Sequence, residues 1–336
     1  MKLNQLLILG LLVLTFQNSK LNAKIIHTDP YDIRRASFNA GFLFTGPRGF
    51  GVFANGSYYL KPNLNLHYSG NFFPLLFMGE QFHDYEDSKA LIHADGKTMF
   101  MYNSVGLDIH FYDKKRPKTT PVVLHTSTET RGTKTINTNY IEQVPTFKRH
   151  VWAVYAGLMT ITGREMFYRY KSGSNDQYEV MNLSSNQNVD IASMSTPDFS
   201  MSVSSYSSIY NLEVGIKNKG IFATAVEHEK YGRKWQDAHA EWYLTALLPV
   251  ASSFESTVSR KNNPNRTYKI INDIKPKPGF KLGFNFRTSV KSNVYMGGDF
   301  GFLPSMTQKS GNVLHFSIRF GYNLNLGKVN YEEVSE

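Results

Sequence analysis

Histidine and carboxylate side chains, which together can bind a divalent metal, stand close to one another in one part of the sequence. His228 lies between Glu227 and Glu229, and His239 is followed by Glu241 across a short loop. Two strands of a hairpin could bring these groups together. Their spacing matches no standard metal site, however, and the polar end of a strand explains them as well. We therefore predict no metal site.

A second acidic group lies between Pro74 and Lys97, a polar stretch that we expect to be a loop. It contains His83, Asp84, Glu86, Asp87 and His93. Calcium loops repeat aspartate or asparagine at alternate positions before a glycine, and this stretch does not. A solvated loop is the simpler interpretation.

Catalytic and cofactor motifs are also missing from the sequence. Serine and histidine residues occur, but nothing groups them as an acyl-transfer site would require. Gly49, Gly51 and Gly56 do not keep the spacing of a dinucleotide-binding loop, and glycines in strands often mark bends. We predict no catalytic residue and no cofactor, and therefore no enzyme.

The clearest pattern is an alternation of polar and apolar residues from Val313 to Leu326. Side chains of a strand point alternately to its two faces, so one face here is apolar or aromatic and the other carries His315, Arg319 and asparagines. The pattern is longer than a typical soluble strand, and a membrane-crossing strand needs about 9–11 residues. An edge or sandwich strand of a soluble secreted protein would also alternate.

The same alternation recurs along the chain and predicts an all-β protein. We expect about 14 strands, or 12 if a doubtful pair is dropped, and the segment 151–161 could also be a short helix. The predicted strands are 36–44, 50–60, 64–69, 99–111, 122–127, 151–161, 166–170, 210–217, 221–229, 240–248, 250–260, 280–290, 294–302 and 313–326.

The connections between these strands differ in length. We expect short turns at 61–63, 162–164, 218–220 and 291–293, and long loops at 74–97, 128–148, 171–202 and 261–266. If the N-terminus lies in the periplasm, all the short turns fall on that side. Short periplasmic turns and long outer loops are typical of outer-membrane barrels. The fold predicted is a closed antiparallel transmembrane β-barrel, because unpaired backbone groups cannot face lipid.

The ends and the composition agree with export. Residues 1–23 have the charged start, the apolar run and the small residue of a secretory signal peptide. We expect a periplasmic lead at 24–35, the barrel at 36–326 and a periplasmic tail at 327–336. There is no cysteine, which excludes disulfides and a lipoprotein anchor. The net charge is +10 and would be about +8 without Lys2 and Lys20, which favours anionic partners such as lipid phosphates.

If the apolar faces point to lipid, the polar faces point into the barrel. A mixed but basic lumen would suit a pore for anionic or neutral solutes, whereas charges that pair across the barrel would close it. The predicted lumen-facing residues are Asp108, His110, Glu213, Lys217, Lys281, Asn285, Arg287, Asp299, Arg319, Asn323 and Asn325.

The cysteine-free signal, the aromatic-rich strands and the final Phe-x-Ile-x-Phe-x-Tyr-x-Leu-x-Leu strand resemble an outer-membrane β-barrel, and the Asn-, Lys- and Tyr-rich style is similar to barrels of the Bacteroidota envelope. No motif of a specific characterised family accompanies the pattern. Many such barrels end on an aromatic residue, whereas this chain continues from Gly327 to Glu336. The resemblance implies a location in the outer membrane of a Gram-negative bacterium.

Three functional hypotheses follow for a barrel. The first is a membrane-embedded structural or interaction subunit, which predicts a filled lumen. The second is a passive pore for small anionic or neutral solutes, which predicts an open one. The third is a barrel enzyme, which predicts histidine grouped with serine or aspartate at the outer rim. The expected partners are outer-membrane lipid and lipopolysaccharide and, through the outer loops, another envelope protein; nucleic acid is not expected.

Overall fold

The computed structural model describes residues 23–28, 36–45, 49–74, 92–94, 99–165, 178–182, 187–189, 201–260, 263–272, 274–288, 293–306, 311–326 and 331–333. Within these ranges no helix is long and apolar enough to cross a bilayer. The strands are β1 (Ala23–Thr28), β2 (Ala36–Thr45), β3 (Gly49–Lys61), β4 (Leu64–Pro74), β5 (Ile92–Ala94), β6 (Met99–Arg131), β7 (Lys134–Glu165), β8 (Tyr178–Asn182), β9 (Gln187–Val189), β10 (Met201–His228), β11 (Gly232–Arg260), β12 (Asn263–Asn272), β13 (Gly279–Thr288), β14 (Val294–Pro304), β15 (Asn312–Leu326) and β16 (Tyr331–Glu333).

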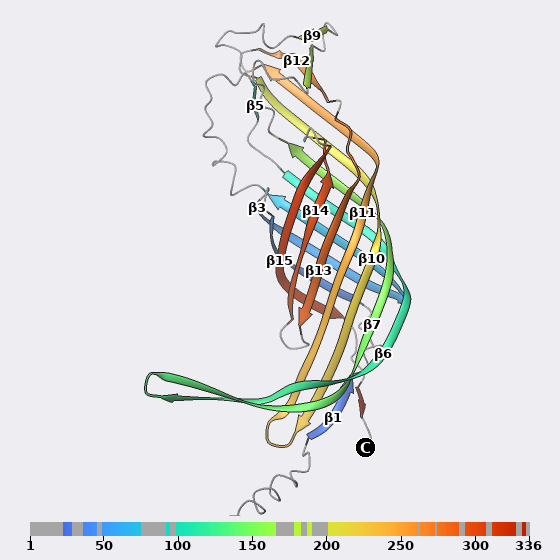
Figure 1. Cartoon of the computed structure of the whole chain (residues 1–336). Helices are drawn as coiled ribbons and strands as arrows, with labels where there is room; N and C mark the ends of the chain where they lie inside the picture. The colour runs from blue at the N-terminus through green and yellow to red at the C-terminus, as the bar shows by residue number, and fades with distance from the viewer. Residues whose placement is uncertain are drawn as a thin grey trace, which may run out of the picture.

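Ten of these strands form a closed ring in chain order (Figure 1). They are β2, β3, β4, β6, β7, β10, β11, β13, β14 and β15, and each pairs with the next in antiparallel orientation. The last strand, β15, pairs with the first, β2, from Ser317↔Thr45 to Leu326↔Ala36. The described fold is therefore a closed antiparallel β-barrel, as predicted.

The outer surface of the ring is apolar. Phe42, Phe111 and Phe320 are 74%, 63% and 56% exposed, and many other large apolar side chains are exposed with them. A water-soluble protein rarely exposes so extensive an apolar surface. Because neighbouring residues of a strand face opposite sides, the same alternation directs polar side chains into the barrel.

The predicted number of strands is wrong, because ten strands rather than 14 or 12 form the ring. Three pairs of predicted strands are single long strands: 99–111 with 122–127 in β6, 210–217 with 221–229 in β10, and 240–248 with 250–260 in β11. The predicted strand 166–170 lies outside the described residues. The segment 151–161 is part of β7 and is not a helix.

Several predicted connections are also corrected. The turn at 61–63 is present, but 162–164 lies inside β7 and 218–220 lies inside β10. The predicted loop 128–148 is mostly strand, and it lies at the end of the barrel that carries the short turns. Most of 74–97, most of 171–202 and the turn residues 291–292 lie outside the described residues, whereas 263–266 begins β12.

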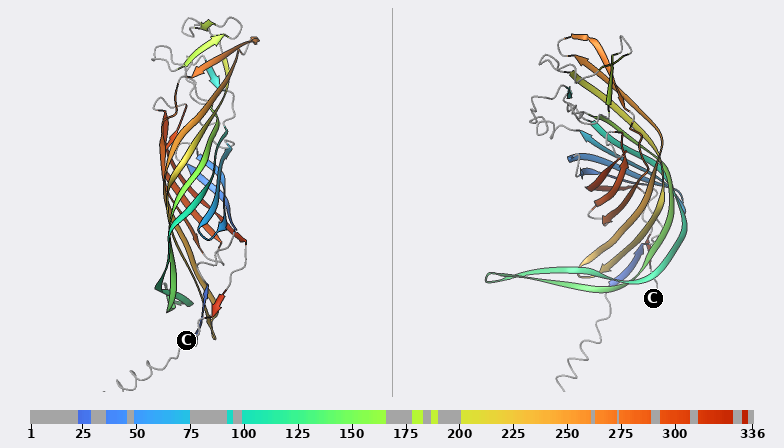
Figure 2. Two further views of the ribbon diagram at one scale, coloured as in Figure 1. Left: turned by 90° about the vertical axis from the view of Figure 1, so that its right-hand side faces the viewer. Right: turned by 45° about the horizontal axis from the view of Figure 1, so that its top comes forward.

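The hairpin of β6 and β7 extends far beyond the ring, and we call residues 112–148 the ribbon (Figure 2). The pairing of β4 with β6 ends at Leu64↔Ile109, and that of β10 with β7 ends at Phe222↔Lys148. Beyond these points the two strands pair only with each other. Gly132, with φ of +60°, allows the tight turn that joins them.

The ribbon bends away from the barrel and crosses the projecting ends of β10 and β11 (Figure 1). Val122, Leu124 and Val144 of the ribbon form a buried apolar cluster with Val226 of β10. The ring of His125 stacks on Tyr231, the residue just before β11, with centroids 4.9 Å apart. These contacts fix the direction in which the ribbon leaves the barrel.

Both chain ends contribute short strands at the same end of the barrel. β1, which contains the last residue of the predicted signal peptide and the start of the predicted periplasmic lead, pairs with the projecting part of β10 from Ala23↔His228 to His27↔Thr224. β16, within the predicted tail, pairs with β1. Residues 1–22 lie outside the described residues, so the predicted signal peptide stays a prediction.

Candidate functional site

The polar interior of the barrel is the candidate site. It contains three groups of charged side chains, the first of which is centred on Asp108. This carboxylate has no exposed surface and lies between Lys217 and Lys219, at 2.8 and 2.6 Å. Asn65 donates a hydrogen bond to it at 3.2 Å, and Lys219 is also 3.6 Å from Glu241. A buried carboxylate flanked by two ammonium groups remains charged, because each charge is compensated by its neighbours.

A second group is centred on Glu213 of β10. Lys281 forms an ion pair with it at 2.7 Å, and Ser104 and Thr245 donate hydrogen bonds at 2.6 and 3.2 Å. The hydroxyl of Tyr155 also donates to Glu213, at 3.3 Å. Because the ammonium group of Lys217 lies 3.9 Å from the centre of the Tyr155 ring, the two groups of charges are in contact.

A third group surrounds Asp299 of β14. Arg319 and His315 lie 2.8 and 2.5 Å from its two carboxylate oxygens, and Tyr243 lies 3.4 Å away. Arg319 also donates to the Tyr243 hydroxyl at 3.1 Å. Gly283 makes room for this tyrosine, because a Cβ there would lie 2.4 Å from its ring. His315 and Asp299 thus lie in contact inside the barrel, and Arg319 forms an ion pair with the same carboxylate.

Amide side chains link the strands that the charges do not. Asn285 donates to Glu241 at 2.9 Å and accepts from Tyr295 at 2.6 Å, and Asn55 donates to Tyr295 at 3.1 Å. Arg287 donates to Ser37 at 2.7 Å. Side chains from all ten strands of the ring therefore take part in the interior contacts.

The remaining predicted lumen residues lie at or near this interior. His110 is buried, and its ring lies 3.7 Å from Asp113, which also forms an ion pair with the buried Arg149. Asn323 is buried. Asn325 lies in β15, but its side chain is outside the described part of the structure.

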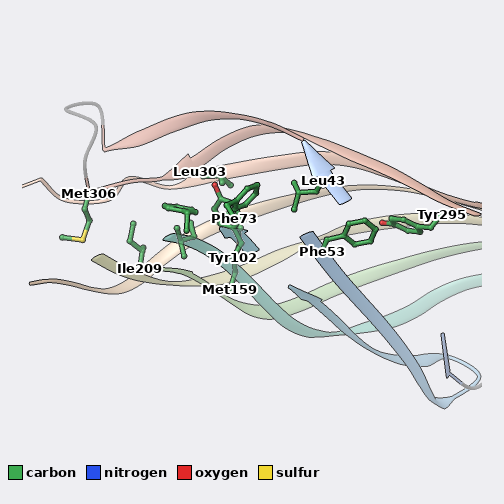
Figure 3. Close-up of a cluster of buried hydrophobic side chains, with 12 residues drawn as sticks. Leu43, Phe53, Phe73, Tyr102, Met159, Ile209, Tyr295, Leu303 and Met306 are labelled. Carbon is green, nitrogen blue, oxygen red and sulfur yellow. The ribbon is translucent and has the colours of Figure 1, made fainter. Parts of the chain in front are cut away.

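A cluster of buried apolar side chains also lies inside the barrel (Figure 3). Leu43, Phe73 and Leu303 lie near the ends of β2, β4 and β14, and Phe100 lies near the start of β6. All four are buried. The apolar cluster of the interior contains Leu43, Phe53, Phe73, Phe100, Tyr102, Met159, Ile161, Ile209, Leu247, Tyr295, Leu303 and Met306.

A small cavity remains where the apolar cluster meets the charges. It is lined by Phe73 and Tyr102 on one side and by Glu213, Lys281 and Arg319 on the other. The volume open to the centre of a water molecule is about 50 Å³. Because one buried water needs roughly 10–15 Å³ by this measure, the cavity has room for only a few water molecules.

Sequence reasoning missed several interior residues, of which Lys219 is the most important. Its spacing of two from Lys217 places it on the same face, but we predicted a turn there. Glu241, Tyr243 and Thr245 alternate with apolar residues in the predicted strand 240–248, but we did not assign them to the lumen. Tyr155 lies in a segment that is apolar on both faces, so the alternation gave no signal for it.

The histidine and carboxylate residues considered for metal binding do not come together. In the pairing of β10 with β11, His228 lies opposite Gly232, whereas His239 lies opposite Ile221. Ile221 is seven residues before His228 in β10. At about 3.3 Å per residue the two histidines are roughly 23 Å apart. Among the described residues, no group of three histidine, aspartate or glutamate side chains could hold a metal ion.

Comparisons with known proteins give only remote similarity. No protein-family model and no curated protein matches the sequence. Among solved structures, the chain is similar to the CymD monoaromatic hydrocarbon channel, with 6% identity over 91% of this chain and 90% of that chain and a TM-score of 0.22. A loop-deletion mutant of OmpT, an outer membrane protein of Vibrio cholerae, shares 10% identity over 86% and 100%, with a TM-score of 0.15.

A bacterial polysaccharide outer membrane secretin shares 8% identity over 88% of this chain and 100% of that chain, with a TM-score of 0.19. Scores of this size do not establish a common fold, so the class of the protein has to come from its own structure. The closed ring, the apolar outer surface and the charged, filled interior are those of a membrane β-barrel.

Proposed function

We propose that this protein is a membrane-embedded structural or interaction subunit in the outer membrane of a Gram-negative bacterium, of the kind found in the Bacteroidota envelope. The observation that carries the proposal is the filled interior. Side chains of all ten strands meet inside the ring, and the cavity between them measures about 50 Å³. A barrel whose interior is closed to solutes would act through the surfaces at its two ends.

The size of the ring supports the same proposal. Barrels of about eight strands are just wide enough for side chains to fill them, whereas barrels of 16–18 strands hold an aqueous channel. Passage of a solute here would have to displace contacts between strands that lie three positions apart in the ring, such as Asn55 with Tyr295 and Arg319 with Tyr243. Leaving buried hydrogen-bonding groups without partners costs about 1–3 kcal/mol each, so the pore hypothesis is the weaker alternative.

The two ends of the barrel offer different surfaces to partners. The strands β5, β8, β9 and β12 lie at the end opposite β1 and β16, and in the proposed orientation they face the cell exterior (Figure 1). They would meet lipopolysaccharide and another envelope protein. The ribbon, β1 and β16 lie at the other end, which would face the periplasm. The proposal includes no enzymatic activity and no cofactor.

The proposal is tested by gentle-detergent purification from native membranes, followed by mass determination and identification of the co-purifying chains. We expect the protein in the outer-membrane fraction with a stoichiometric partner. Cross-linking from introduced cysteines is unambiguous here, because the chain has no cysteine of its own. A partner-free particle that conducts ions would replace the proposal with a pore, and recovery in the soluble fraction would exclude a membrane barrel altogether.

A further inference from the structure

Four cationic side chains share one face at the root of the ribbon. In the pairing of β6 with β7, Lys114 lies opposite His150, Arg116 opposite Lys148, and Lys118 opposite Thr146. Lys114, Arg116 and Lys118 are exposed, and Lys148 is half-buried. Because side chains alternate, all four are on the same face as the preceding pair Tyr112↔Trp152.

This face continues the lipid-facing surface of the barrel. Trp152 is two residues from the exposed Val154 in β7, and its ring meets Trp242 of β11 edge-on at 5.2 Å. Trp242 is 40% exposed. Tryptophan and tyrosine are typical of the zone where the lipid hydrocarbon meets the headgroups. The four cations therefore follow directly after the aromatic edge of the apolar surface.

The bend of the ribbon turns this face into a crease, which we define by Lys114, Arg116, Lys118 and Lys148. The ribbon crosses the projecting strands β10 and β11 (Figure 1), and Lys118 lies 5.8 Å from the ring centre of Phe222 on β10. Lys114 lies 5.4 Å from the ring centre of Tyr112, and Arg116 donates to the Tyr112 hydroxyl at 2.8 Å. Aromatic contacts thus hold the charged ends of Lys114, Arg116 and Lys118 on the lipid-facing side.

The crease has an uncompensated positive charge. The nearest acidic residue in sequence, Asp113, points to the opposite face and forms an ion pair with Arg149. In the part of the chain that the structure describes, none of the four crease cations forms an ion pair with a carboxylate. Lysine and arginine beside a membrane attract anionic headgroups by about 1 kcal/mol each, and arginine binds phosphate oxygens in pairs.

We propose that the crease binds the phosphate group of an anionic phospholipid at the headgroup level of the leaflet on the side of the chain termini. The inference rests on the membrane location in the proposed function but not on the partner proposed there. Binding at this place would hold the root of the ribbon against the membrane surface. The ribbon would then extend along the membrane, close to the direction that it takes across the end of the barrel in Figure 2.

The test compares full-length protein and a variant with Lys114→Gln, Arg116→Gln, Lys118→Gln and Lys148→Gln in neutral detergent. Phosphatidylglycerol is titrated, and retained lipid is counted by native mass spectrometry. We expect the variant to bind phosphatidylglycerol at least about tenfold more weakly than the unchanged protein. Phosphatidylcholine should bind both proteins equally weakly, and free inorganic phosphate should not displace the lipid at millimolar concentration.

A matched control carries Lys134→Gln, Lys230→Gln, Lys275→Gln and Lys277→Gln, which remove the same charge from exposed positions outside the crease. It should bind like the unchanged protein. Equal binding by the crease variant and the control would overturn the proposal. If the fourfold variant does not fold, Arg116→Gln with Lys118→Gln should show a smaller loss in the same direction, and no loss would again overturn it. Failure of the unchanged protein to enter phosphatidylglycerol vesicles would instead refute the membrane location.

Discussion

Asp108 shows how strongly single residues determine the closed interior. It is buried, and the ammonium groups of Lys217 and Lys219 lie 2.8 and 2.6 Å from its oxygens. Asp108→Asn would keep the shape of the side chain but leave two buried cations with much weaker compensation. We expect the free energy of unfolding to fall by about 3–5 kcal/mol, measured by denaturant titration in detergent.

The control for this substitution is Glu255→Gln, which changes a carboxylate on an exposed part of β11. It should change the free energy of unfolding by no more than about 0.5 kcal/mol. If Asp108→Asn were as stable as this control, the lysines would not depend on Asp108, and the interior would be more hydrated than the contacts indicate.

The contact between Glu213 and Lys281 gives a second test at the residue scale. Their charged atoms lie 2.7 Å apart, on strands that are not adjacent in the ring. A double-mutant cycle with Glu213→Gln and Lys281→Met should give a coupling energy of about 0.5–3 kcal/mol, because residues in direct contact are not additive. Additive effects of the two substitutions would show that the two side chains do not interact inside the barrel.

The interior residues were partly predictable. Alternation alone is enough to assign Asp108, Glu213 and Arg319 to the face opposite the apolar one, because a strand has only two faces. Which of these charges pair with one another was not predictable, since Asp108 and Glu213 pair with residues on strands that are not their neighbours in the ring. Lys219 was not assigned to the lumen, because Asn218-Lys219-Gly220 has the composition of a turn. Only the tertiary contact of Lys219 with Asp108 explains why this residue lies inside a strand.

At the scale of elements, the ribbon is the largest departure from expectation. Its outer part, around 126–140, is rich in threonine and asparagine and has no apolar face, so hydrophobic alternation gave no sign of it. Threonine nevertheless favours strands, and Gly132 supplies the turn. The pairs Thr126–Asn139 and Thr128–Asn137 join the two strands by side-chain hydrogen bonds of 2.8 and 2.9 Å.

The ribbon is expected to be dispensable for closure of the barrel. A deletion that replaces residues 119–145 with Asn-Gly would connect the paired residues Lys118 and Thr146 by a two-residue turn. Every pair of neighbouring ring strands would keep its hydrogen bonds, so the barrel should assemble in detergent with unchanged circular dichroism per remaining strand residue. Loss of the apolar cluster around Val226 should lower the unfolding temperature by only a few degrees.

The control for the deletion is a change within the ring. Gly157 of β7 pairs with β6 on one side and with β10 on the other. Gly157→Pro would therefore remove a backbone hydrogen-bond donor where strand pairing is needed on both sides. It should prevent assembly under conditions in which the deletion variant folds. Failure of the deletion variant itself would show that the ribbon is required to form or close the ring.

At the scale of the whole molecule, the number of strands and the filling of the interior belong together. The predicted 14-stranded barrel would have enclosed a wider lumen, and the polar faces would have suggested a pore. Long strands account for most of the difference, because β6, β10 and β11 each contain two of the predicted strands. In a ring of ten strands, Asp108, Glu213 and Asp299 form ion pairs with cations on adjacent or next-but-one strands, and these side chains take up interior space.

Ion conductance in planar lipid bilayers tests the closed interior most directly. The purified protein should insert without producing steady single-channel currents, because the cavity inside the ring holds only a few water molecules. Asp108→Asn combined with Glu213→Gln, which weakens the paired charges, should produce at most brief openings. Steady, ohmic single-channel steps from the unchanged protein would contradict the account and would identify the barrel as a pore.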